Sequence, residues 1–151
     1  MPALTSEKAV VLFRHPSRGL ARTSLRAFAA TLQREVAGGR VFICLLSGDA
    51  ELRRLNREFR KKDYPTDVLS FPAAQLNGSL GEIAISLSRA RIQAEEQGHD
   101  IDSEVRILML HGVLHLLGMD HENDSGEMAR AERKWRRHFE LPAGLIERVS
   151  A

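Results

Sequence analysis

Three histidines with the spacing H-x-x-x-H-x-x-x-x-x-H are the residues of this sequence best suited to chemistry: His111, His115 and His121. Imidazole is the commonest metal ligand in proteins near neutral pH. On a helix His111 and His115 lie one turn apart and about 40° apart around the axis, and Gly118 lets the helix end and the chain turn back. The returning chain can bring His121 to the same point. Three nitrogen ligands with a fourth position open are typical of a catalytic zinc site rather than a structural one.

The segment around the first two histidines predicts a buried helix. Residues 107–117 read ILMLHGVLHLL, which is apolar on every helical face, and such helices are normally buried. Each buried imidazole without a partner costs about 1–3 kcal/mol. A lone core histidine is usually satisfied by a carbonyl or a carboxylate, but the triple spacing favours a shared metal ion.

The same spacing is that of the metzincin zinc peptidases, which carry a glutamate general base directly after the first histidine. Here that position is Gly112, so a peptidase is only a minor alternative. A bound zinc ion can itself acidify water, and other carboxylates follow closely in sequence: Asp120, Glu122, Asp124 and Glu127. Of these, Asp120 is the best candidate to accept a hydrogen bond from a metal-bound imidazole.

A second group of chemically interesting residues is basic. Residues 52–62 place cationic side chains around an apolar stripe: Arg53, Arg54, Arg57, Arg60, Lys61 and Lys62. Such a run is either an ordinary solvated helix face or a phosphate-binding surface beside the metal, where it would stabilise a phosphodiester transition state. Composition leaves both interpretations open. Aromatic residues make up only 5% of the chain, which argues against a platform for stacking bases.

Several other residues are expected to be unremarkable. We expect Phe59 and Phe71 to belong to the core and Glu104 to lie in solvent or at a helix terminus. The histidines outside the motif are expected to be surface or ordinary packing residues: His15, His99 and His138.

The elements that must position these residues alternate between strands and helices. We expect strands at residues 9–13, 40–46, 68–71 and 80–85. We expect helices from Thr23 or Ser24 to 36, at 48–60 with Leu52, Leu55 and Phe59 inward, from Ser86 or Ser88 to 97, at 102–117, and from about 124 to 140. The predicted fold is therefore α+β, an α/β sandwich in which a small mixed sheet of about four strands packs with about five helices, one of them a metzincin-like zinc-binding helix.

Length and composition favour a single domain over residues 1–151. Hydrophobic content of 43% and charged content of 28% are ordinary for a globular protein. The single cysteine, Cys44, lies in an apolar run and is interpreted as a core residue, which fits a reducing, cytoplasmic setting. We find no signal peptide and no membrane span. A net charge of +2 permits a polyanionic partner without requiring one.

Four segments together resemble the YbeY family of bacterial endoribonucleases. They are LNREFR at residues 55–60, PTDVLSFP at 65–72, LGEI at 80–83 and HGVLHLLGMDH at 111–121. Their order and spacing cover the chain from about residue 50 to 128. One departure is Met119, where the family commonly has tyrosine.

The resemblance implies one zinc ion held by His111, His115 and His121, and a role for Arg60 in catalysis or phosphate binding. Lys61 and Lys62 are weaker candidates for RNA contacts. It also implies cleavage of single-stranded RNA, maturation of the 3′ end of 16S rRNA and ribosome quality control. The expected partners are rRNA and the ribosomal small subunit or its assembly factors in a bacterial cytoplasm, with no DNA or membrane. Two alternatives stay open: a zinc hydrolase of peptides or small molecules, and a non-catalytic ribosome assembly factor with a structural metal.

Overall fold

The computed structural model describes residues 8–14, 19–64, 66–73 and 78–150, in which four strands form one mixed sheet. The strands are β1 (Val10–Phe13), β2 (Val41–Ser47), β3 (Val68–Pro72) and β4 (Ser79–Ser86), in the order β1-β2-β4-β3. β1 and β4 are both parallel to β2, whereas β3 is antiparallel to β4 and forms an edge of the sheet. The expected α+β fold with a four-stranded mixed sheet is confirmed.

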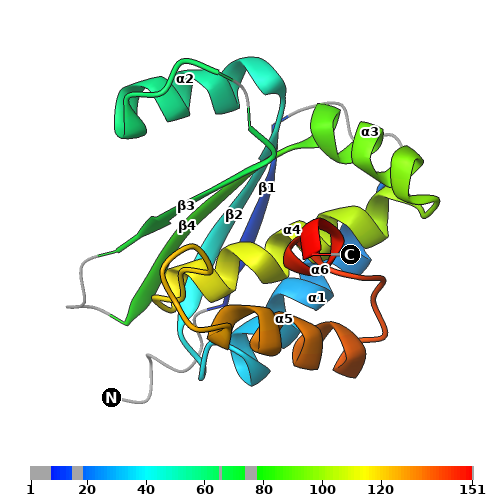
Figure 1. The fold of residues 1–151 in the computed structure, drawn as a ribbon. Coiled ribbons are helices and arrows are strands. Elements are labelled where there is room, and N and C mark those ends of the chain that lie inside the picture. The colour runs from blue at the N-terminus through cyan, green and yellow to red at the C-terminus, as the bar shows by residue number, and fades with distance from the viewer. Residues whose placement is uncertain (1–7, 15–18, 65, 74–77, 151) are drawn as a thin grey trace.

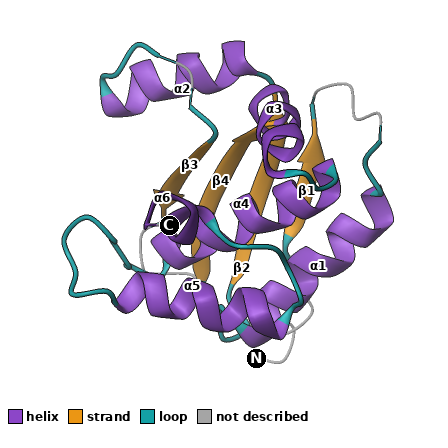
Figure 2. Ribbon diagram, turned by 45° about the vertical axis from the view of Figure 1, so that its right-hand side comes forward, coloured by secondary structure: helices purple, strands orange, loops and turns teal. Residues whose placement is uncertain are grey.

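Helices cover the two faces of the sheet unequally (Figures 1 and 2). They are α1 (Arg22–Glu35), α2 (Asp49–Arg60), α3 (Leu87–Gln97), α4 (Ile101–Leu116), α5 (Glu127–His138) and α6 (Leu145–Ser150). α2 lies on one face, and α1 and α4 lie on the other, with α5 and α6 packed outside α4. Five of these helices correspond to sequence predictions, and α6 was not predicted. None of the described helices combines the length and apolar composition that a membrane crossing requires.

Helix α4 is the central helix of the larger layer, which explains its apolar sequence. Its first turn is capped by Asp100, whose carboxylate accepts a hydrogen bond from Ser103 N at 2.8 Å. A Cβ at Gly112 would lie only 2.9 Å from Ile83 Cγ2 of β4, so glycine lets the helix approach the sheet closely. Ser70 of β3 also donates a hydrogen bond to the Gly112 carbonyl at 3.2 Å. These contacts place one face of α4 against the sheet and leave its neighbouring face toward the edge strand.

Strand β3 separates two environments by its alternating side chains. Leu69 is buried with Leu52 of α2 and Ala84 of β4 on one face. Val68 and Ser70 point the other way and line a cavity with the histidines of α4. The edge strand therefore connects α2 with the candidate metal centre.

Two side chains predicted from periodicity differ in the structure. Phe59 was expected to face the core, but it is 65% exposed and touches Phe71 only in a T-shaped contact with ring centroids 5.6 Å apart. The ring lines an open cavity together with Leu12 of β1 and Ile43 of β2, which leaves it in contact with solvent. Glu104 was expected in solvent or at a helix terminus. It does lie in the first turn of α4, but its exposed fraction is 0% because Arg148 of α6 covers it.

The start of α1 also differs from its prediction. Neither Thr23 nor Ser24 is the N-cap; that position is Ala21, whose N–H donates to the Asp102 carboxylate of α4 at 3.1 Å. Ser24 instead accepts a hydrogen bond from Arg106. A tertiary contact thus replaces the local cap that the sequence suggested.

The structure agrees with the predictions for Cys44, His99 and His138. Cys44 is buried in the core, and burial raises the pKa of its thiol to about 12. His138 is exposed and bonded to Glu35 at 2.8 Å, and His99 packs against Glu104 at 2.7 Å. His15 lies outside the described residues.

Candidate metal centre

The end of α4 folds back as the sequence predicted. Gly118 has a φ of +94°, which favours glycine. Its N–H donates to the His115 carbonyl at 2.9 Å, and the N–H of Met119 donates to the Leu114 carbonyl at 3.2 Å. These two bonds form a Schellman motif that ends the helix. The turn brings His121 back toward the two histidines of the helix.

The three imidazole rings meet at one point. The Nε2 atoms of His111 and His115 are 3.1 Å apart, and one ligand atom from each of the three histidines lies within 4.8 Å of the others. His111 Nδ1 is 2.8 Å from Glu132 Oε2, and His115 Nδ1 is 2.9 Å from the Met119 carbonyl oxygen. The second nitrogen of each helical histidine is therefore fixed by the protein.

These hydrogen bonds decide where the ring protons lie. A carbonyl oxygen only accepts, so His115 carries its proton on Nδ1 and presents a lone pair at Nε2. The Glu132 carboxylate imposes the same arrangement on His111. Two lone pairs that face each other repel, unless a cation lies between them. In a tetrahedral zinc site with bonds of about 2.0–2.1 Å, ligand nitrogens lie about 3.3 Å apart, so the residues fit a small divalent cation.

Electrostatics favours the neutral form of the His115 ring. Burial lowers the pKa of His115, and the neighbouring His111 and His121 lower it further, against the opposing effect of the Met119 carbonyl. Neutral imidazole is the form that binds metal ions. The contact to residue 119 uses the backbone carbonyl, so it does not depend on the side chain at that position.

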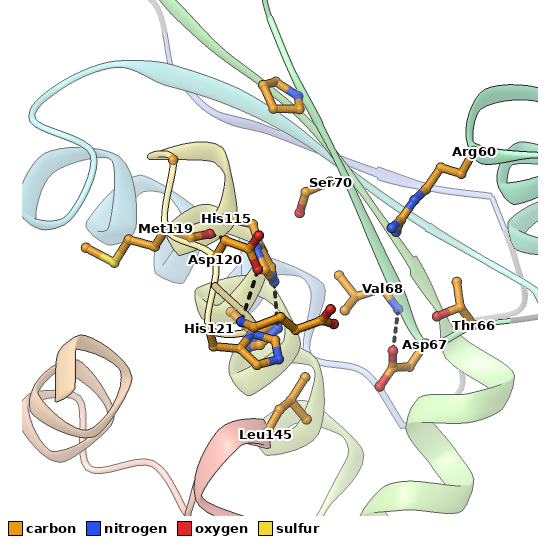
Figure 3. Close-up of a pocket in the computed structure, with 14 residues that line it drawn as sticks. Arg60, Thr66, Asp67, Val68, Ser70, His115, Met119, Asp120, His121 and Leu145 are labelled. Atoms are coloured by element: carbon orange, nitrogen blue, oxygen red, sulfur yellow. Dashed lines mark hydrogen bonds between the residues drawn. The ribbon is translucent and has the colours of Figure 1, made fainter. Parts of the chain in front are cut away.

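The three histidines lie at the wall of a cavity of about 630 Å³. Its lining comes from β3 and the segment before it, α2, α4, α6 and the loop after α4: Arg60, Thr66, Asp67, Val68, Ser70, Pro72, His111, His115, Gly118, Met119, Asp120, His121, Glu122 and Leu145. Figure 3 shows the Arg60 guanidinium beside β3, across the cavity from His115 and His121. The structure thus brings together all four predicted site residues. Lys61 and Lys62 are exposed after α2 and do not line the cavity.

The basic run on α2 contains two kinds of residues. Arg53 and Arg57 bind Asp63 at 2.8 and 3.7 Å, and Arg54 binds Glu58 at 3.2 Å. These three arginines match the solvated helix face that most charge runs represent. Across the described ranges, no carboxylate forms an ion pair with Arg60. Its guanidinium is therefore available to an anion in the cavity.

The acidic residues next to His121 in sequence mostly form local hydrogen bonds. Asp120 accepts hydrogen bonds from Glu122 N at 3.1 Å and Asn123 Nδ2 at 2.5 Å, and the Asn123 bond is the main cause of its lowered pKa. Asp124 accepts from the backbone N–H groups of Gly126 and Met128.

Asp120 was expected to accept a hydrogen bond from a ligand imidazole. The structure instead pairs His111 with Glu132 and His115 with the Met119 carbonyl, while Asp120 holds the turn. Of the four candidate bases, Glu127 accepts from Ser125 N, and only Asp120 and Glu122 line the cavity.

Sequence reasoning missed the residue that orients His111. Glu132 lies on α5 and is 1% exposed. It stands four residues after the buried Met128, on the inward face of an amphipathic helix. The available sequence signal was a carboxylate on the inward-facing, otherwise apolar side of this helix. Asp67, also missed, lines the cavity and accepts from Val68 N at 2.8 Å and Gln93 Nε2 at 3.1 Å.

Comparison with known proteins places this arrangement in a family. The profile of the family described as endoribonuclease YbeY matches residues 14–140. A protein named endoribonuclease YbeY from Solibacter usitatus is 59% identical over 96% of this chain and 97% of its own length. Another of that name, from Koribacter versatilis, is 48% identical over 93% and 92%.

Structural comparison agrees with these relatives. The solution structure of TM1509 from Thermotoga maritima matches with a TM-score of 0.60 and 26% identity, covering 85% of this chain and 86% of that one. The histidine cluster, the fold and the extent of these matches lead to one conclusion: this chain belongs to the YbeY endoribonuclease family.

Proposed function

We propose that this chain is a zinc-dependent endoribonuclease specific for single-stranded RNA, with Arg60, His111, His115 and His121 as its site residues. The observation that carries the proposal is the convergence of three imidazoles on a cavity whose opposite side presents the Arg60 guanidinium, which has no carboxylate partner among the described residues. A metal beside a free cation suits a phosphodiester, because negative charge develops on the phosphate oxygens during cleavage.

The residues of the chain divide the work. His111, His115 and His121 would hold the zinc ion, which supplies Lewis acidity to polarise a phosphoryl oxygen or acidify water. Arg60 would bind the non-bridging oxygens through charge-assisted hydrogen bonds and orient the phosphate. Peptide hydrolysis fits less well, because the position of the peptidase glutamate is Gly112, which packs against Ile83.

The biological setting is proposed from the family. The relatives are named endoribonucleases, and the resemblance described above points to maturation of the 3′ end of 16S rRNA and ribosome quality control in the bacterial cytoplasm. The partners would then be single-stranded rRNA and the small subunit or its assembly factors, with residues 1–151 acting as one domain.

The first experiment combines metal analysis with RNA digestion. We expect one zinc ion per chain, cleavage of single-stranded RNA, and loss of cleavage after treatment with a chelator. Duplex RNA, single-stranded DNA and a protease substrate serve as specificity controls. A 2′,3′-cyclic phosphate product indicates attack by the ribose hydroxyl, whereas a 5′-phosphate product without it indicates attack by water. Peptide cleavage without RNA cleavage would contradict the proposal.

Arg60→Ala tests the role of the guanidinium. Cleavage should fall by roughly 10²–10³-fold, while zinc content stays unchanged. The matched control is Arg57→Ala. Arg57 lies on the same helix, but it binds Asp63 and does not line the cavity. Equal rates for the Arg60 variant and the unmodified protein would exclude a catalytic role for Arg60.

The ribosomal role needs a test in cells. Depletion of this protein should cause 16S rRNA precursors with extended 3′ ends to accumulate, and Arg60→Ala should fail to restore maturation. Full restoration by a variant without cleavage activity would instead favour the non-catalytic assembly factor.

A further inference from the structure

The buried carboxylate of Glu132 connects three elements at the back of the metal centre. Its Oε2 lies 2.8 Å from His111 Nδ1, and its Oε1 accepts a hydrogen bond from the backbone N–H of Ile146 in α6 at 2.9 Å. α4, α5 and α6 therefore meet at one carboxyl group. Each of its two oxygens has a different partner, so the orientation of the group is fixed.

The start of α6 is shaped to accept this carboxylate. Gly144 is buried, and a Cβ there would overlap the carboxyl group of Glu132. No positive φ requires glycine at this position. The missing side chain is thus explained by the space that the Glu132 carboxylate occupies.

The Glu132 carboxylate has no direct contact with a basic side chain other than His111 among the described residues. Within the described part of the chain, no lysine or arginine forms a salt bridge with it; Arg136, one turn along α5, binds Glu147 instead. An ionised carboxylate is costly to bury without a compensating positive charge. A cation on the far nitrogen of His111 would supply that charge through the imidazole ring.

We propose that Glu132, held by the first turn of α6, is a positioning residue for the metal centre. Its carboxylate keeps the His111 proton on Nδ1 and turns Nε2 toward the point shared with the other two histidines. It also makes the ring a stronger ligand, as carboxylate partners of metal-bound histidines do. The inference rests on the metal site of the proposed function, but it concerns metal affinity and not RNA.

The test measures zinc affinity by competition with a chromophoric chelator. Glu132→Gln keeps the size of the side chain but replaces one acceptor oxygen by a donor, and Glu132→Ala removes both oxygens. We expect zinc binding weakened roughly 10- to 100-fold, more in the alanine variant. Gly144→Ala keeps Glu132 but forces its carboxylate to move, so zinc binding should weaken there as well. The visible spectrum of the Co²⁺-substituted proteins should change with the ligand geometry.

Glu104→Gln is the matched control. Glu104 is also buried, also contacts a histidine and also holds α6 through Arg148, but it does not touch a metal ligand. Its variant should bind zinc like the unmodified protein. Circular dichroism of the metal-free proteins verifies that each variant is folded.

Two results would overturn the proposal. One is unchanged zinc affinity and an unchanged Co²⁺ spectrum in both Glu132 variants. The other is an equal loss in Glu104→Gln, which would assign the effect to α6 docking. Absence of RNA cleavage by the unmodified protein would refute the proposed function but leave the affinity comparison valid.

Discussion

The molecule contains two buried carboxylate–imidazole pairs that look alike and differ in how their charge is balanced. Glu132 binds His111 at 2.8 Å and Glu104 binds His99 at 2.7 Å. Both carboxylates also hold α6. Glu104 does so through the Arg148 guanidinium, with contacts of 2.9 and 2.7 Å, whereas Glu132 does so through a neutral backbone N–H.

This difference in charge balance distinguishes the Glu104–His99 pair, which is structural, from the Glu132–His111 pair, which we assign to the proposed metal site. The charge of Glu104 is neutralised within the fold, so its pair is complete without any added ion. The Glu132 pair ends at an imidazole nitrogen that faces another nitrogen 3.1 Å away. The same two residue types would therefore serve stability in one place and the proposed ion binding in the other.

The largest expected effect is on the Glu104 pair. Glu104→Ala leaves the Arg148 guanidinium and His99 without their buried acceptor, and breaking a buried ion pair costs about 3–5 kcal/mol. Urea unfolding in the presence of a chelator measures this loss. The folded fraction should still bind zinc normally. A loss below about 1 kcal/mol would show that solvent reaches the pair, and the comparison would fail.

Zinc-dependent stability distinguishes the two pairs most directly. At a free zinc concentration about 1,000-fold above Kd, binding adds about 4 kcal/mol to the free energy of unfolding. Glu132→Gln should lose about 1.4–2.7 kcal/mol of that increment, because each tenfold weaker Kd removes about 1.4 kcal/mol. Glu104→Gln should keep the full increment. Thermal or urea unfolding with and without zinc provides the measurement, and equal increments in both variants would contradict the assignment.

Both pairs depend on the docking of α6, which acid should weaken. The Arg136 guanidinium hydrogen-bonds Glu147 of α6 and lowers the pKa of that carboxyl from 4.5 to about 2. The folded state therefore favours the ionised form, so its stabilisation is complete above about pH 4.5 and is lost as pH falls toward 2.

Glu147→Gln should remove about 1–2 kcal/mol of stability at about pH 6 and less at about pH 3. Urea unfolding of both proteins across this range tests the sign. A stability difference that grows as pH falls would be incompatible with the Arg136 contact.

The smallest effect is expected for His99→Gln. Arg148 still satisfies Glu104, so the loss should be about 1 kcal/mol, the value of one hydrogen bond. The equivalent change His111→Gln should abolish tight zinc binding. Zinc titration and urea unfolding of the two variants complete the comparison. Strong loss of zinc binding in the His99 variant would mean that the pairs are coupled.

Local sequence was sufficient for the parts of the site that lie in one segment. The spacing of His111 and His115 and the turn at Gly118 depend on helix geometry and on a C-cap, both of which are properties of a few adjacent residues. The order of strands and helices followed from hydrophobic periodicity in the same way. The role of Arg60 did not follow from spacing, since its neighbours Arg54 and Arg57 have the same side chain and it was the family resemblance that distinguished it.

Tertiary partners could not be predicted. The inward position of Glu132 on α5 does not reveal that its partner is His111, and Glu104 has no sequence signal for Arg148. α6, which contacts both carboxylates, is too short for a clear periodic signal. Phe59 has the spacing of an inward residue, but its ring lines an open cavity and stays exposed. In each case the outcome depends on what a distant segment covers.

The contact between Gly112 and Ile83 limits which reactions this scaffold can acquire by mutation. A single exchange to glutamate at position 112 would reproduce the motif of a zinc peptidase on paper, but β4 occupies the space that its side chain needs. Laboratory conversion into a peptidase would require at least a paired change that also shortens residue 83. The close spacing of helix and sheet at Gly112 therefore disfavours a single substitution that would place a glutamate beside His111.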